Sequence, residues 1–141
     1  MKKFWNSQLG RNILFVIILF AAAMLMGKCD SDNAVRIHSS EDMIAVNSKT
    51  FNMNIPYDVI AELALEQVPD LGRTVDGKNN DSLRTGIWEN ETWGEYHLCL
   101  DPDATNCIVA YLNDGRTFVF NRKNAEETEN IYRQILEKMP N

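Results

Sequence analysis

The sequence predicts a mainly β domain, a small barrel closed by one C-terminal helix. Segments with β propensity recur between turns through residues 33–121. An amphipathic helical pattern with a capping residue follows at 126–139. An apolar run near the N-terminus precedes the domain and predicts a membrane helix before it. Together these observations indicate one anchored domain with a single core.

The apolar run predicts a transmembrane segment at residues 13–28. It carries no charge before Lys28, and three basic residues precede it, namely Lys2, Lys3 and Arg11. This is the layout of a signal anchor or of a cleavable signal peptide. Residues 13–27 as a helix span about 22 Å, shorter than a hydrocarbon core of roughly 30 Å. Both alternatives therefore stay open, and we favour an uncut anchor.

The charges around this segment predict the membrane topology. Three basic residues and the α-amino group lie before it, against Lys28 and Arg36 close behind it. Residues 1–12 should therefore stay in the cytoplasm. The domain at residues 33–139 would then lie outside the cell membrane, as the extracytoplasmic part of a single-pass protein.

The domain is strongly acidic. From residue 29 onward, ten Lys and Arg stand against twenty Asp and Glu, a net charge of −10. Nucleic-acid binding and the binding of anionic lipid headgroups by a polybasic segment both need clustered Lys and Arg, which this sequence lacks. We therefore expect no nucleic-acid partner, and we expect the membrane to be reached through the N-terminal helix.

The first half of the domain predicts short strands and turns. Residues 33–38 and 43–47 are β-prone, and apolar and polar residues alternate over 51–55. Residues 57–68 fit a helix or a strand, and we favour a turn followed by a strand. Residues 69–84 have turn chemistry throughout and predict a mobile surface loop.

The second half predicts three consecutive antiparallel strands at 93–100, 107–112 and 117–121, the last two joined by a tight turn at Gly115. A helix closes the chain. Asn124 can cap its start, with Glu127 three residues later. One face of the helix is apolar and should join the core, through Thr128, Ile131, Tyr132, Ile135, Leu136 and Met139.

Several segments together resemble a bacterial PH-like (pleckstrin-homology-like) domain over residues 33–139. They are NIPYDVIAELAL, the glycine of TWGEYHL, the hairpin YLNDGRTFVFN and the helix EETENIYRQI. The resemblance implies about seven antiparallel strands in two sheets, with the C-terminal helix plugging one open end. Some eukaryotic relatives bind phosphoinositides through basic loops, and the acidic sequence departs from that pattern. We therefore expect no phosphoinositide binding.

The resemblance also implies structural roles for individual residues. Pro56 and Tyr57 would turn the chain between strands, and Gly94 would let strands cross closely. Asn121, with Thr128 and Tyr132, would fix the helix on the barrel. None of these roles is catalytic.

Cys99 and Cys107 bracket a short loop between two predicted strands. Outside the membrane they could close a disulfide across a hairpin, or they could remain two partly buried thiols. The cysteines and histidines lack the spacing of zinc ligands, so we expect no metal and no cofactor.

Trp88 and Trp93 lie among acidic residues and are candidates for stacking on a partner, although we favour packing in the core. Asn79, in the predicted loop, is a third candidate contact. The sequence contains no nucleophile with a base that would argue for an enzyme. We expect a membrane-anchored, non-catalytic binding module with another envelope protein as partner. The alternatives are a regulatory or assembly subunit of an integral membrane complex and, less favoured, a hydrolase using surface carboxylates.

Overall fold

The computed structural model describes residues 35–140, which fall within one compact unit, Asp32–Asn141. The predicted membrane segment at 13–28 and the N-terminal residues 1–12 lie outside the described residues. Within the described part of the chain, no helix is long and apolar enough to cross a membrane.

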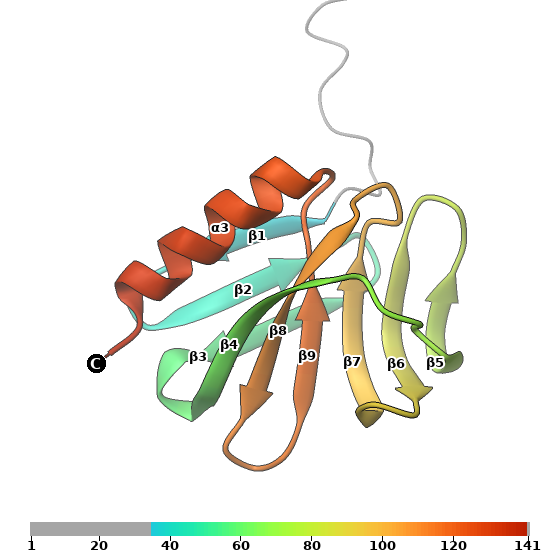
Figure 1. The fold of residues 1–141 in the computed structure, drawn as a ribbon, viewed down its shortest axis with the longest axis horizontal. Coiled ribbons are helices and arrows are strands. Elements are labelled where there is room, and N and C mark those ends of the chain that lie inside the picture. The colour runs from blue at the N-terminus through green and yellow to red at the C-terminus, as the bar shows by residue number, and fades with distance from the viewer. Residues whose placement is uncertain (1–34, 141) are drawn as a thin grey trace, which may run out of the picture. The chain divides into compact units, whose positions relative to one another are not determined.

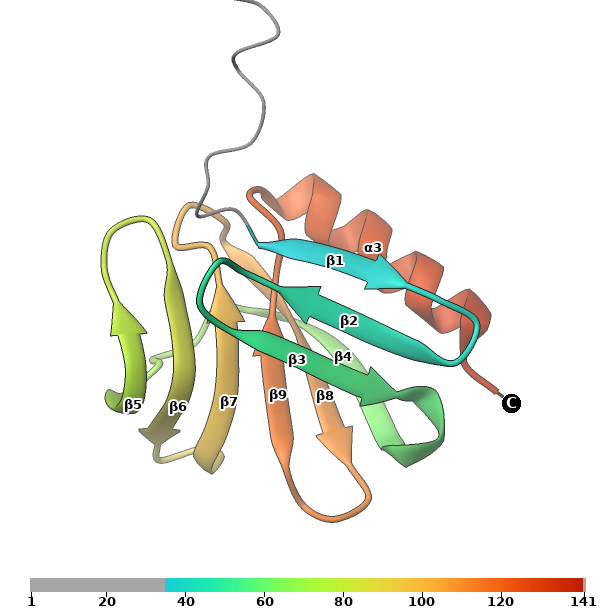
Figure 2. The same cartoon turned by 180° about the vertical axis from the view of Figure 1, so that it is seen from behind.

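Two sheets and one long helix make up the domain (Figures 1 and 2). The smaller sheet is a meander of β1 (Arg36–Ser39), β2 (Met43–Asn47) and β3 (Asn52–Pro56). The larger sheet has the order β4-β8-β9-β7-β6-β5. Its strands are β4 (Ile60–Gln67), β5 (Arg73–Asn79), β6 (Arg84–Asn90), β7 (Gly94–Leu100), β8 (Asn106–Leu112) and β9 (Thr117–Phe120). A short 3-10 turn, η1 (Tyr57–Val59), links the sheets, and α3 (Ala125–Lys138) follows β9. The predicted mainly β class, with two sheets and a C-terminal helix, is confirmed.

The strand count and the pairing differ from the prediction. The described residues form nine strands rather than about seven, and β7 pairs with β9 in parallel. β7 and β8 are therefore not neighbours, because β9 lies between them. Five connecting residues, 101–105, reach about 16 Å when extended, which is enough to pass one intervening strand. Local pattern predicts a strand well but does not say which strand lies beside it.

Residues 57–68 form a turn and then a strand, as predicted. The loop predicted at 69–84 is wrong in its middle, where residues 73–79 form β5. Most side chains of this strand are exposed, so it lacks the alternation of apolar and polar residues that marks a half-buried strand. Its conformation comes from pairing with β6.

The main core, which we call the inner core, lies between the two sheets and under α3. It contains Ile44, Val46 and Ile55 from the small sheet, Ile108 and Phe120 from the large one, and Ile135 from the helix. The Asn124 side chain accepts a hydrogen bond from the Glu127 amide at 2.8 Å, so the predicted helix cap is confirmed. Capping and burial together fix the helix at one end of the domain.

A second core covers the other face of the large sheet. The link from β4 to β5 runs across this face, from one edge of the sheet to the other (Figure 1), and we call residues 68–72 the strap. The strap is held by a 2.7 Å hydrogen bond from the Tyr96 hydroxyl to the Leu71 carbonyl. A bond from the Val68 amide to the Thr105 carbonyl fastens its other end. Leu71 of the strap packs into the outer core, which also contains Trp88, Tyr96, Leu98, Leu100, Cys107, Val109 and Val119.

Candidate functional site

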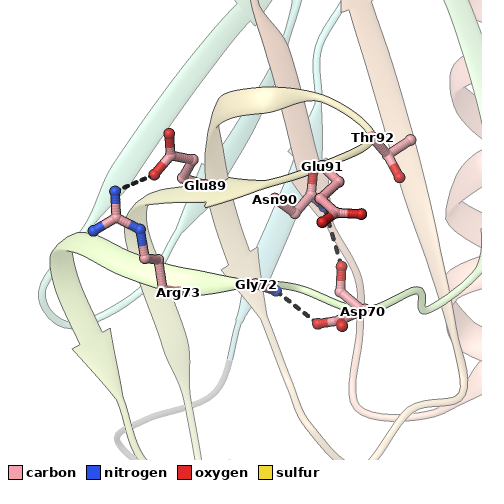
Figure 3. Close-up of a pocket in the computed structure, with 7 residues that line it drawn as sticks. All are labelled: Asp70, Gly72, Arg73, Glu89, Asn90, Glu91 and Thr92. Atoms are coloured by element: carbon pink, nitrogen blue, oxygen red, sulfur yellow. Dashed lines mark hydrogen bonds and ion pairs between the residues drawn. The ribbon is translucent and has the colours of Figure 1, made fainter.

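A pocket lies where the strap meets β5 and the turn between β6 and β7. Its volume is about 560 Å³, and we call it the acidic pocket. Figure 3 shows its lining, which is Asp70, Gly72, Arg73, Glu89, Asn90, Glu91 and Thr92. Two chain segments about twenty residues apart thus build one concave surface.

Local hydrogen bonds shape the pocket. Asp70 Oδ1 accepts from the Gly72 amide at 2.9 Å, which closes a tight turn at the end of the strap. Gly72 has φ +79°, and a Cβ there would lie 1.9 Å from the Glu89 carbonyl oxygen. Asn90 joins both sides of the pocket, donating to the Asp70 carbonyl at 3.1 Å and accepting from the Trp93 amide at 2.8 Å. The lining is therefore built on a braced backbone.

The pocket carries excess negative charge. Arg73 forms an exposed ion pair with Glu89, which neutralises one of three carboxylates. Asp70 and Glu91 form no ion pair with any described residue. Within residues 35–140, no group of three or more His, Cys, Asp or Glu is arranged to hold a metal ion. The arrangement suits a basic side chain or an amine as its guest.

The two candidate tryptophans differ. Trp88 is only 2% exposed, and its Nε1 donates to the Thr85 carbonyl at 3.0 Å. The prediction that Trp88 contacts a partner is therefore wrong, because the outer core already occupies its ring. Trp93 is half-buried beside the pocket turn, packs edge-on against Tyr96 and donates to the Tyr111 hydroxyl at 3.2 Å. A role for Trp93 in partner contact stays a prediction.

The disulfide alternative for Cys99 and Cys107 is wrong. Both thiols are free and fully buried, and they lie on opposite faces of the large sheet. Cys99 packs in the inner core and Cys107 in the outer core, with β9 between their strands. Burial raises the pKa of each thiol to about 12. Neither thiol is poised for reaction in the folded protein.

The turn residues implied by the resemblance have mixed outcomes. Pro56 ends β3 and precedes η1, and the Tyr57 hydroxyl donates to the Ser40 carbonyl at 2.9 Å, so both turn the chain as expected. Gly115 forms the β8–β9 turn with φ +89°. The role predicted for Gly94 is wrong. A Cβ at Gly94 would meet nothing within 4 Å, so this glycine serves a turn with φ +68° rather than a close crossing of strands.

The helix contacts are confirmed for Thr128 and Tyr132. Thr128 is fully buried, and its Oγ1 accepts from the Arg122 amide at 3.0 Å and donates to the Asn124 carbonyl at 2.8 Å. The Tyr132 hydroxyl reaches the Leu63 carbonyl at 3.4 Å. Asn121 does not touch the helix in this way. It instead binds Asp101 and Asn106, which fixes the 101–105 connection over β9.

Asn79 lies exposed at the end of β5, one of the two edge strands of the large sheet. The acidic pocket begins at the opposite end of the same strand, at Arg73. Sequence reasoning missed the pocket residues, for which only the turn chemistry around Asp70 and Gly72 gave a local signal. Their meeting with residues 89–92 depends on the strap, which no local pattern predicts.

Comparison with protein-family models, with curated proteins and with solved structures finds no match for this chain.

Proposed function

We propose that this protein is a membrane-anchored, non-catalytic interaction module of the PH-like kind, which presents its domain outside the cell membrane and binds an envelope protein. The single observation that carries the proposal is the open edge of β5. This strand pairs with β6 on one side only within the described residues. An unpaired edge can accept an extended segment of another protein as an added strand.

The hydrogen-bond pattern indicates which groups of β5 face outward. The Asn80 amide donates to the Leu83 carbonyl at 3.2 Å, so this pair is hydrogen-bonded. Hydrogen-bonded and non-hydrogen-bonded pairs alternate along an antiparallel ladder. The pairs Asn79–Arg84 and Gly77–Gly86 are therefore non-bonded, and the N–H and C=O groups of Asn79 and Gly77 point away from β6. These groups are available to a partner strand.

The β1 edge of the small sheet differs from the β5 edge. At β1, Lys138 Nζ donates to the Ser39 carbonyl at 2.6 Å, and Arg122 donates to the Val35 carbonyl. Carbonyls at both ends of that edge are thus satisfied within the domain. Covering an edge in this way prevents pairing with other chains. The contrast supports β5, and not β1, as the edge that binds.

Crosslinking in intact cells tests the proposal. A photoreactive residue replaces Asn79 in the full-length chain, and a matched variant carries it at exposed Glu137 on α3. We expect a discrete crosslinked protein of the envelope with the first variant and none with the second. Equal crosslinking from both positions, or none from Asn79, would refute the edge as the binding surface.

The topology needs a separate test, because the buried thiols of Cys99 and Cys107 cannot report it. We place a cysteine at exposed Lys49, in the turn after β2, and treat cells with a membrane-impermeant thiol reagent. The wild-type chain gives the background. Labelling of Lys49→Cys in intact cells supports an extracytoplasmic domain, and labelling only after lysis contradicts it.

A further inference from the structure

The acidic pocket lies at one end of the open β5 edge. Gly72 and Arg73, which lead into the strand, also line the pocket. An extended chain paired with β5 therefore passes the mouth of the pocket at its Arg73 end. A partner strand on this edge would lie about 4.8 Å from β5, and a long Lys or Arg side chain at the Arg73 end would extend past β5 toward the pocket.

The charge of the acidic pocket favours a basic side chain of the partner. Asp70 and Glu91 lack ion-pair partners among the described residues, whereas Arg73 is already paired with Glu89. The whole domain from residue 29 has a net charge of −10, so its field attracts a basic segment and repels an acidic one. A basic guest would gain the interaction with both carboxylates.

A second copy of this chain is a poor occupant of the same edge. Antiparallel self-pairing of β5 about its centre sets Asp76 against Asp76, and parallel self-pairing sets each charge beside its own copy. Like charges directly opposite each other destabilise a strand pair. The acidic net charge of the two domains adds a further repulsion.

We propose that β5 and the acidic pocket together bind an extended segment of a partner protein that carries a Lys or Arg, with its backbone on the β5 edge and its basic side chain between Asp70 and Glu91. This inference rests on the proposed function, since it assumes that the β5 edge accepts a strand. It adds the chemistry of the partner and the direction of the charge preference.

Synthetic peptides test the inference on the full-length chain, in lipid nanodiscs or in buffer according to the fraction in which it is recovered. The probe is a nine-residue peptide of alternating Thr and Val with one Arg near an end, and the control peptide has Glu in place of that Arg. We expect the Arg peptide to bind at least about tenfold tighter, because two carboxylates attract one and repel the other. Its affinity should fall as salt is raised.

Three variants separate the pocket from the edge. Glu91→Gln removes an exposed carboxylate and should weaken the Arg peptide several-fold, while Glu137→Gln on the exposed face of α3 should not. Asn79→Pro removes an outward N–H without breaking the ladder to β6, so it should weaken both peptides. Thermal melting shows whether each variant is folded.

The outcomes are distinguishable. If both peptides bind equally and Glu91→Gln changes nothing, the pocket inference is wrong while the edge proposal stands. If Glu91→Gln weakens the Arg peptide but Asn79→Pro does not, the pocket binds a cation without the edge, and the combined site is refuted. If no peptide binds and Asn79 yields no crosslink, both proposals fail.

Discussion

Gly77 and Gly86 face each other across β5 and β6, and neither position has room for a side chain. A Cβ on Gly77 would lie 2.0 Å from the Thr85 carbonyl oxygen, and one on Gly86 would lie 2.1 Å from the Asp76 carbonyl oxygen. Backbone atoms cannot move aside as a flexible side chain can. The outermost strand of the large sheet is thus joined to the sheet by a glycine contact.

This contact predicts a large loss of stability for Gly86→Ala. Its backbone also has φ +103°, so strain adds to the clash, and we expect a cost of about 3 kcal/mol or more. Gly94→Ala is the matched control, because it has φ +68° but open space around it, and it should cost only about 1–2 kcal/mol. Chemical denaturation of the two variants measures the difference. Equal costs would mean that the strands can separate to admit a methyl group.

Asn121 predicts a second stability effect. It is fully buried, and its side chain makes three hydrogen bonds to the 101–106 segment. Asn121→Ala should destabilise the fold by about 3 kcal/mol, since each bond contributes about 1 kcal/mol and the backbone groups lose their partner. Asn113→Ala, which removes one exposed bond of 3.3 Å to Asp58, should cost less than about 0.5 kcal/mol. Similar losses in the two denaturation curves would contradict this account of the 101–105 connection.

The two buried thiols lead us to expect that the stability of the domain does not depend on a reductant. Because Cys99 and Cys107 are free and on opposite faces of the sheet, adding a reductant should leave the melting temperature unchanged. A thiol reagent should modify them only after the domain unfolds. Mass spectrometry with and without denaturant measures this. A mass lower by two hydrogen atoms for the fragments that hold these cysteines in the native protein, or a lower melting temperature on reduction, would revive the disulfide.

The surroundings of His97 lead us to expect that the folded domain loses stability in mild acid. Its ring stacks on Phe118 with centroids 4.6 Å apart, and burial together with nearby Arg116 lowers its pKa, against the opposing charge of Glu95. The unfolded chain therefore binds the proton more readily than the folded domain. The contribution of His97 to stability is complete above pH 6.5, the ordinary pKa, and is lost as the pH falls below it.

The check compares denaturation midpoints between pH 7.5 and about pH 5 in the wild type and two variants. His97→Gln should flatten this part of the profile, and Arg116→Gln should flatten it partly because one unfavourable charge is removed. If the stability of His97→Gln falls with pH as steeply as that of the wild type, other titratable groups cause the acid sensitivity.

The parts of the fold that sequence predicts are those with local causes. Asn124 and Glu127 lie three residues apart and make the helix cap by themselves, and Gly115 alone supplies the positive φ of its turn. β5 was missed because its side chains are exposed and its strand conformation depends on β6. The disulfide alternative was wrong for a similar reason, since the distance between Cys99 and Cys107 depends on which strand lies between them.

The candidate site was largely beyond sequence reasoning. Asp70 and Glu91 meet only because the strap crosses the sheet, and Asn90 then braces that crossing. Trp88 shows the reverse case. Its acidic neighbours suggested exposure, yet the strap and the outer core bury it.

The path of the strap also sets the order in which the large sheet can be completed. β4 and β5 follow one another in the chain but lie at opposite edges, and among the described strands β4 pairs with β8 alone. The β5–β6–β7 meander can pair while the chain is still growing, whereas β4 can pair only after β8, about forty positions later, has been made. β9 then joins the two halves, because among the described strands it is the one that pairs with both β7 and β8. A nascent chain that ends before Thr117 has the strands of both halves but lacks the strand that pairs with each of them.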